Sequence, residues 1–236
     1  MNSSIALLSV TAVSLGFLHT ILGPDHYLPF IVLSKAKNWS MKKTMIITFL
    51  CGLGHVFSSV ILGLIGIAVG ISVSKLVSAE SFRGNIAAWL FIAFGLIYML
   101  ISIRNLIRNR KHTHSHFHLD GKKHVHEHDH HQEHTHIHQV EKQNTAPWIL
   151  FIIFVFGPCE PLIPLLMYPA AQNNIHGSII VSLLFSLATV GTMMSVVAAF
   201  KFGLNKINLK PLERYSHVIA GAVIFFSGVV IQFLGL

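Results

Sequence analysis

Long apolar stretches alternate with short polar ones along the chain. Runs of about 20 apolar residues are long enough to cross the hydrocarbon core of a bilayer as helices. They predict six membrane spans, at 4–33, 44–73, 86–103, 147–170, 178–200 and 215–235. We therefore predict an all-α integral membrane protein, with three spans before a polar central segment and three after it.

Two related helix-breaking motifs divide this pattern into repeats. The first span contains Gly-Pro-Asp-His at 23–26, and the fourth contains Gly-Pro-Cys-Glu at 157–160, 134 residues later. Each proline removes a backbone donor and opens its helix. Because each repeat has three spans, the second enters the membrane from the opposite side. We expect two inverted three-helix repeats, over 1–103 and 147–236, whose first helices (spans 1 and 4) are broken, joined by a disordered loop over 104–146.

Composition and charge support a membrane location. The chain is 53% hydrophobic and 11% charged, well below the roughly 25% charge of a soluble domain. Its net charge of +8 is spread between apolar stretches, which argues against the clustered basic face of a nucleic-acid-binding protein. Fifteen of the 17 Lys and Arg fall in the first, third and fifth loops. The positive-inside rule then predicts that both termini lie outside and the central loop lies in the cytoplasm. We expect the membrane to be a prokaryotic plasma (inner) membrane. No Lys or Arg precedes Lys35, so the first span lacks a signal peptide's basic region and is expected to be retained.

A small set of ionisable groups lies within the predicted spans without a Lys or Arg beside it. Each carboxylate at bilayer depth costs about 2.5 to 3.5 kcal/mol, and a bound cation would compensate that cost. Imidazole and carboxylate ligands suit nickel, cobalt or zinc better than magnesium or calcium. The alternative for each histidine is a hydrogen bond between helices. The predicted metal ligands near the membrane midplane are His19, Asp25, His26, His55 and Glu160, with Cys159, Cys51 and Thr189 as lower-ranked candidates.

The central loop is rich in histidine, mostly spaced as His-x-His. It contains few apolar residues, so burial cannot offset the entropy of ordering it, and we expect disorder. Neutral imidazoles at this density bind transition metals. The predicted metal-gathering residues are His112, His114, His116, His118, His124, His126, His128, His130, His131, His134, His136 and His138.

Three segments resemble the nickel and cobalt transporter (NicO-like) family: HTILGPDHYLPF (19–30), GLGHVFSS (52–59) and FGPCEPLIPLL (156–166). They are most similar to its six-span branch, which includes urease-accessory membrane proteins and resistance-type exporters with histidine-rich loops. The resemblance implies nickel or cobalt as the substrate, with His19, Asp25, His26 and His55 on the metal path.

These observations predict a transmembrane transporter of a divalent transition-metal ion, and not an enzyme. Nickel and cobalt are favoured and zinc also fits; import and export are both compatible with the loop. No cofactor is expected beyond the transported metal. The expected partners are the metal ion, the lipid bilayer and a cytoplasmic metallochaperone, without nucleic acid.

A second interpretation of the same chain is a membrane thiol-disulfide electron carrier. The GPCEP segment resembles the proline-flanked cysteine of carriers that pass thiol reducing equivalents across the bilayer. Such a carrier would use Cys159 and Cys51, which both lie in apolar stretches. The two positions are not equivalent in the repeat, and this interpretation ranks second.

Overall fold

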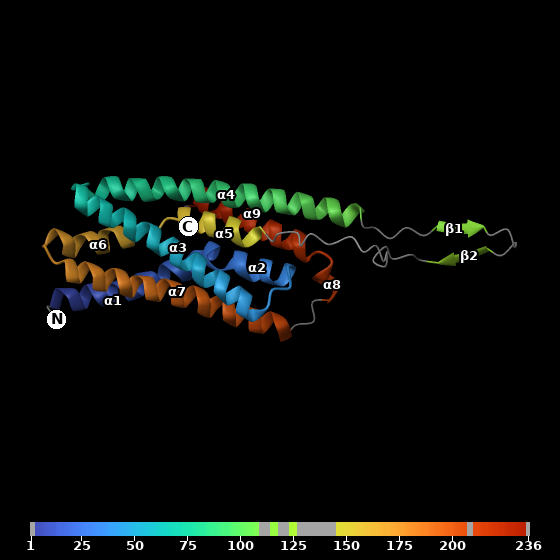
Figure 1. The fold of residues 1–236 in the computed structure, drawn as a ribbon, viewed down its shortest axis with the longest axis horizontal. Helices are drawn as coiled ribbons and strands as arrows, with labels where there is room; N and C mark the ends of the chain where they lie inside the picture. The colour runs from blue at the N-terminus through green and yellow to red at the C-terminus, as the bar shows by residue number, and fades with distance from the viewer. Residues whose placement is uncertain (1–2, 109–113, 118–122, 127–144, 207–209, 235–236) are drawn as a thin grey trace.

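The structure, a computed structural model, describes residues 3–108, 114–117, 123–126, 145–206 and 210–234. The helices run roughly along one long axis (Figure 1). The first half contains α1 (Ser3–Leu22), the 3-10 helix η1 (Pro24–His26), α2 (Leu28–Ala36), α3 (Met41–Val69) and α4 (Val73–Arg108). The second half contains α5 (Ala146–Phe156), α6 (Leu162–Ala171), α7 (Ile175–Lys206), α8 (Lys210–Glu213) and α9 (Ser216–Leu234).

Local signals set several of these helix ends. At the start of α3 the Ser40 side chain accepts a hydrogen bond from the Lys43 amide, which satisfies one free backbone donor. The same helix ends at Gly70, whose φ of 72° is the left-handed conformation common after a helix. Pro147 lies in the first turn of α5, where its missing N–H costs nothing.

Within the described part of the chain, five helices are long and apolar enough to cross a membrane, namely α1, α3, α4, α7 and α9. The fourth predicted span is divided into α5 and α6, each too short to cross alone. The prediction of an all-helical membrane protein is thus confirmed for the spans. The third predicted span, 86–103, extends in both directions as α4, which runs from Val73 to Arg108.

Within the central loop the structure describes one short hairpin. Strands β1 (His114–Phe117) and β2 (Lys123–His126) pair antiparallel, with His114 opposite His126. Four of the predicted metal-gathering histidines lie in these strands. The other eight, and the rest of the disorder prediction, lie outside the described residues.

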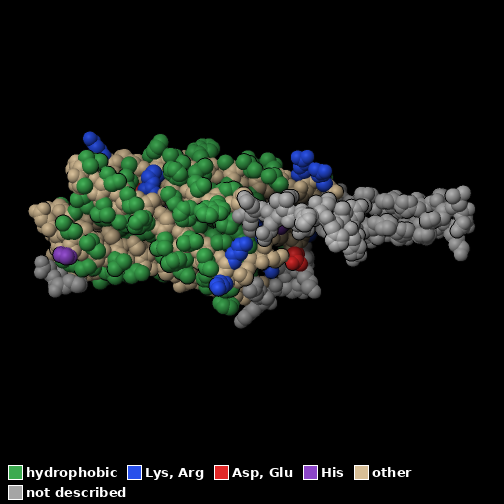
Figure 2. All heavy atoms as spheres, viewed as in Figure 1, with side chains coloured by type: hydrophobic (Ala, Val, Ile, Leu, Met, Phe, Trp, Pro, Cys, Tyr) green, Lys and Arg blue, Asp and Glu red, His purple; other side chains and the backbone are tan. Residues whose placement is uncertain are grey.

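The helices pack as pairs that join the two halves. α4 lies along α9, α1 lies along α7, and α3 contacts α5, α6 and α7. Figure 2 shows apolar side chains over most of the visible face of the bundle, with few charged ones. The exposed apolar side chains of the bundle include Leu7, Phe57 and Trp148, at 70%, 65% and 72%. Exposed apolar surface of this extent is what lipid covers, so the chain is a multi-pass membrane protein in contact with the bilayer.

The connections lie at two ends of the bundle. The α2–α3 connection and α8 lie at one end in Figure 1, whereas the α3–α4 and α6–α7 connections lie at the other, with the N-terminus. The lysine-rich first and fifth loops are therefore at the same end, as the charge pattern predicts.

Candidate functional site at two helix breaks

The first helix break folds His26 back over Gly23. The Gly23 amide donates to the His19 carbonyl, and the chain then continues through η1 into α2. A Cβ at position 23 would lie 2.5 Å from His26 Nδ1, so only glycine leaves room for the ring. Nδ1 faces two acceptors, the Gly23 carbonyl and Asp25 Oδ1, each at 3.1 Å. We therefore assign the proton to Nδ1, which leaves Nε2 of His26 with a free lone pair.

Three histidine rings meet beside this break. The His26 ring centroid is 4.7 Å from that of His19 and 5.0 Å from that of His55, and the two Nε2 atoms of His26 and His55 are 3.4 Å apart. One nitrogen from each ring lies within 4.8 Å of the others, so the three could hold a metal ion. Nε2 of His19 is buried and has no hydrogen-bond partner. A cavity of about 250 Å³ adjoins the three rings and Asp25.

Two predicted members of this site lie elsewhere. Glu160 follows the buried Cys159 but its own side chain is exposed, and among the described residues it does not join the histidine group. Thr189 is buried on α7, where its Oγ1 lies close to Gly16 of α1 and has no hydrogen-bond partner. The structure therefore does not bring Glu160 together with the histidine group.

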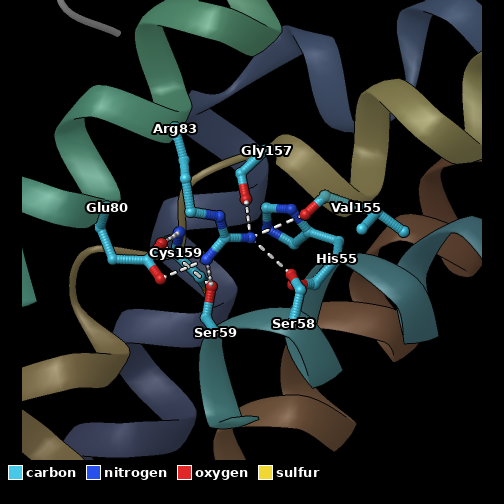
Figure 3. Close-up of polar contacts among 8 residues, drawn as sticks. All are labelled: His55, Ser58, Ser59, Glu80, Arg83, Val155, Gly157 and Cys159. Atoms are coloured by element: carbon cyan, nitrogen blue, oxygen red, sulfur yellow. Dashed lines mark hydrogen bonds and ion pairs between the residues drawn. The ribbon is translucent and has the colours of Figure 1, made fainter. Parts of the chain in front are cut away.

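The second break is held by an ion pair that the sequence analysis missed. Glu80 and Arg83 lie three residues apart on α4, and their side chains are 0% and 17% exposed. Arg83 reaches from α4 to two other segments (Figure 3). Its guanidinium donates to Glu80, to Ser58 Oγ at 2.6 Å and to the Val155 carbonyl at 2.7 Å.

The statement that the spans contain no basic side chain is thus wrong, because α4 begins 13 residues before the predicted span. The sequence signal that could have revealed the ion pair is an acid and a base three residues apart, a spacing that places both side chains on one face of a helix.

This ion pair replaces the backbone hydrogen bonds that the break removes. In a continued helix the Val155 carbonyl would accept from the Cys159 amide, and the Gly157 carbonyl from residue 161, which is a proline. Instead Arg83 donates to both carbonyls, at 2.7 and 3.4 Å. The Cys159 amide donates to Glu80 Oε2 at 2.8 Å. The pair therefore supplies one acceptor and two donors where α5 is interrupted.

The two cysteines are buried free thiols at different depths. Cys159 is 0% exposed and Cys51 is 1% exposed. Cys159 shares the carboxylate of Glu80 with Ser59, whose hydroxyl donates to Oε2 at 3.0 Å. Cys51 lies eight residues before Ser59 on α3, about 12 Å of helix. The cysteines also belong to separate apolar clusters.

These features define a multi-pass helical membrane protein with two interrupted helices and a cysteine at one interruption. Residues 28–230 match the model of the family described as cytochrome c biogenesis protein transmembrane region. The match covers most of the chain, and the chain belongs to this family. No curated protein matches it, and no solved structure does.

This finding overturns the interpretation as a nickel and cobalt transporter. Both the assignment to that family and the prediction of metal-ion transport are wrong, because a different family model matches residues 28–230. The motifs behind the resemblance are short, and interrupted apolar helices occur in several kinds of membrane protein. A buried carboxylate also need not imply a bound metal ion, because the buried Glu80 is neutralised by Arg83.

Proposed function

We propose that the chain carries thiol reducing equivalents across a membrane, with Cys159 and Cys51 as its redox pair. The observation that carries this proposal is Cys159 at the α5–α6 break of a chain belonging to a cytochrome c biogenesis membrane family. It acts as a carrier between partner proteins and not as an enzyme with a substrate of its own, and its thiols need no organic cofactor.

The redox step is a pair of thiol-disulfide exchanges. One thiolate of the chain attacks the disulfide of an acceptor protein at the outer face, forming a mixed disulfide. The second thiolate resolves it, so that the acceptor leaves as a dithiol with two electrons and two protons, and the chain holds a Cys51–Cys159 disulfide. A dithiol protein in the cytoplasm then reduces that disulfide by the reverse exchange.

This cycle requires the two cysteines to meet. A disulfide needs Cα atoms about 4.4 to 6.8 Å apart, whereas Cys51 lies about 12 Å of helix from the level of Ser59 and Cys159. Residues 157–161 join two short helices, so we propose that this connection moves along α3 during the cycle.

We extend the proposal to the arrangement of the chain in the membrane. The two breaks, at 23–27 and 157–161, divide it into two three-span repeats of opposite direction. The lysine-rich loops then face the cytoplasm of a prokaryotic inner membrane, with both termini outside. Cys51, ten residues into α3, is on the cytoplasmic side of Cys159 in this orientation.

The test is to trap the disulfide. Membranes carrying the full chain are treated with diamide, quenched with acid, denatured and alkylated with a maleimide mass tag. We expect a population in which neither cysteine accepts the tag, lost in both Cys51→Ser and Cys159→Ser, where the remaining thiol is tagged. The proposal is wrong if both cysteines of the wild-type chain stay fully taggable after excess oxidant.

We also propose a metal-binding role for the three histidines, separate from transport. It is supported by the three converging nitrogens and the partnerless Nε2 of His19. Asp25, through its bond to Nδ1 of His26, would orient that ring as a ligand. Nickel, cobalt and zinc are all compatible with such a nitrogen donor set.

Metal stoichiometry tests this second proposal in the full chain. After saturation with cobalt and gel filtration, His55→Ala should carry one ion fewer per chain than wild type. His176→Ala, which removes an exposed histidine at the start of α7, should match wild type. Equal metal content in wild type and His55→Ala would exclude the site.

A further inference from the structure

The Glu80–Arg83 pair brings two opposite charges to the backbone of Cys159. Glu80 Oε2 accepts from the Cys159 amide, and Arg83 donates to the Gly157 carbonyl two residues earlier. Figure 3 shows the carboxylate, the guanidinium and Cys159 gathered at the break.

The other described surroundings of Cys159 add little charge. From α3 the ring of His55 lies against Gly157, and Ser58 and Ser59 are uncharged. The neighbouring Glu160 is exposed. The apolar cluster that contains Cys159 also includes Ala12 of α1 and Val181, Phe185 and Val190 of α7. Glu80 and Arg83 are thus placed to determine whether Cys159 carries a proton.

We propose that Glu80 and Arg83 are positioning residues that set the charge state of Cys159, with Arg83 stabilising the thiolate and Glu80 stabilising the protonated thiol. This rests on the function proposed above, in which Cys159 reacts as a thiolate. In the step the S–H bond of Cys159 breaks, the sulfur keeps the electron pair and the proton is released to the aqueous phase. Glu80 stays ionised throughout.

The arrangement avoids creating an unpaired charge inside the bundle. Before the step Arg83 is paired with the Glu80 carboxylate alone, and after it the guanidinium also compensates the thiolate, so the new negative charge has a cation near it. An isolated thiolate in a low-dielectric interior would have no such compensation. The bonds of Arg83 to Val155 and Ser58 hold the guanidinium in place throughout.

The pH profile of Cys159 alkylation tests this assignment. The full chain in a Cys51→Ser background is treated with iodoacetamide, a small uncharged reagent, and the rate is followed by intact mass across a pH series. Glu80→Gln leaves Arg83 free to pair with the thiolate, so the midpoint should fall by about one pH unit or more. Arg83→Gln should raise it by a similar amount, and Arg83→Lys should stay close to the parent.

Controls separate this role from a purely structural one. Glu160→Gln removes the adjacent exposed carboxylate, and Lys75→Gln removes an exposed cation from the same helix; neither should move the midpoint. If the pair only held the break closed, Glu80→Gln and Arg83→Gln would both raise the rate at every pH. Shifts in the same direction, or no shift, would overturn the proposal.

Two further features keep the test decisive. If Arg83→Gln does not fold, Glu80→Gln alone decides, since an unchanged midpoint overturns the proposal and a lower one supports it. The measurement uses one cysteine and no partner protein, so it is independent of disulfide trapping. If the Cys51–Cys159 disulfide does not form, the pH shifts of alkylation can still be interpreted. If the pH shifts are absent, the result of disulfide trapping still stands.

Discussion

Replacing Glu80 by alanine should lower the free energy of unfolding by about 3 to 5 kcal/mol, the range found when one member of a buried ion pair is removed. Arg83 would remain in the bundle without its anion, and the Cys159 amide and Ser59 hydroxyl would lose their acceptor. Denaturant titration of the purified protein in detergent micelles measures the change.

Glu160→Ala is the matched control for this prediction. It removes a carboxylate of the same kind next to Cys159, but from an exposed side chain, and should change stability by no more than about 0.5 kcal/mol. A Glu80→Ala protein as stable as Glu160→Ala would mean that water or another donor-acceptor pair replaces the carboxylate at the break.

The spans could be predicted from the sequence because each is a long apolar stretch, and both breaks because Pro24 and Pro158 follow a glycine. The start of α4 could not be predicted in the same way. The residues before 86 include Lys75, Glu80 and Arg83, which a hydropathy pattern assigns to a loop. They are helical because Glu80 and Arg83 pair with each other and with the backbone of the α5–α6 break. A hydropathy pattern does not reveal tertiary hydrogen bonds of this kind.

The histidine group was predicted in part, but the turn that brings its rings together was not. His19 and His26 are seven residues apart, a spacing that would place them on one face of an unbroken helix. The helix instead ends at Leu22, and the turn over Gly23 brings His26 against His19. His55 joins them from α3 as expected. Glu160 was included through the repeat, but the two breaks differ locally: Pro161 follows Glu160 directly, and the Glu160 side chain is exposed.

The function could not be settled from motifs, because an interrupted apolar helix with polar neighbours is compatible with both ion transport and thiol-disulfide exchange. A buried carboxylate does not by itself require a bound metal ion, because Arg83 neutralises Glu80 at the second break. The backbone of Cys159, whose thiol is the proposed reactive group, contacts the same carboxylate. The family match over 28–230 agrees with the interpretation that ranked second.

The contact between α4 and α9 should be the most sensitive packing surface of the bundle. A Cβ at Gly95 would fall on the backbone nitrogen and Cα of Phe225, and a Cβ at Gly221 would lie 2.6 Å from the Met99 backbone nitrogen. Helix backbones therefore touch through glycines on both helices. Backbone atoms cannot rotate away, and helices in lipid have no hydrophobic drive to compensate for lost contacts.

Gly95→Leu should consequently separate α4 from α9 and destabilise the protein by about 3 kcal/mol or more, at the upper end of overpacking costs. The expected result is loss of the monodisperse peak in size-exclusion chromatography, or a strongly lowered midpoint in denaturant. Gly191→Leu is the control, because a Cβ at Gly191 meets nothing within 4 Å, and it should match wild type in both measurements. If Gly95→Leu and Gly191→Leu behave alike, α4 and α9 are not in backbone contact at Gly95, and the pairing of the two halves through these helices would need to be revised.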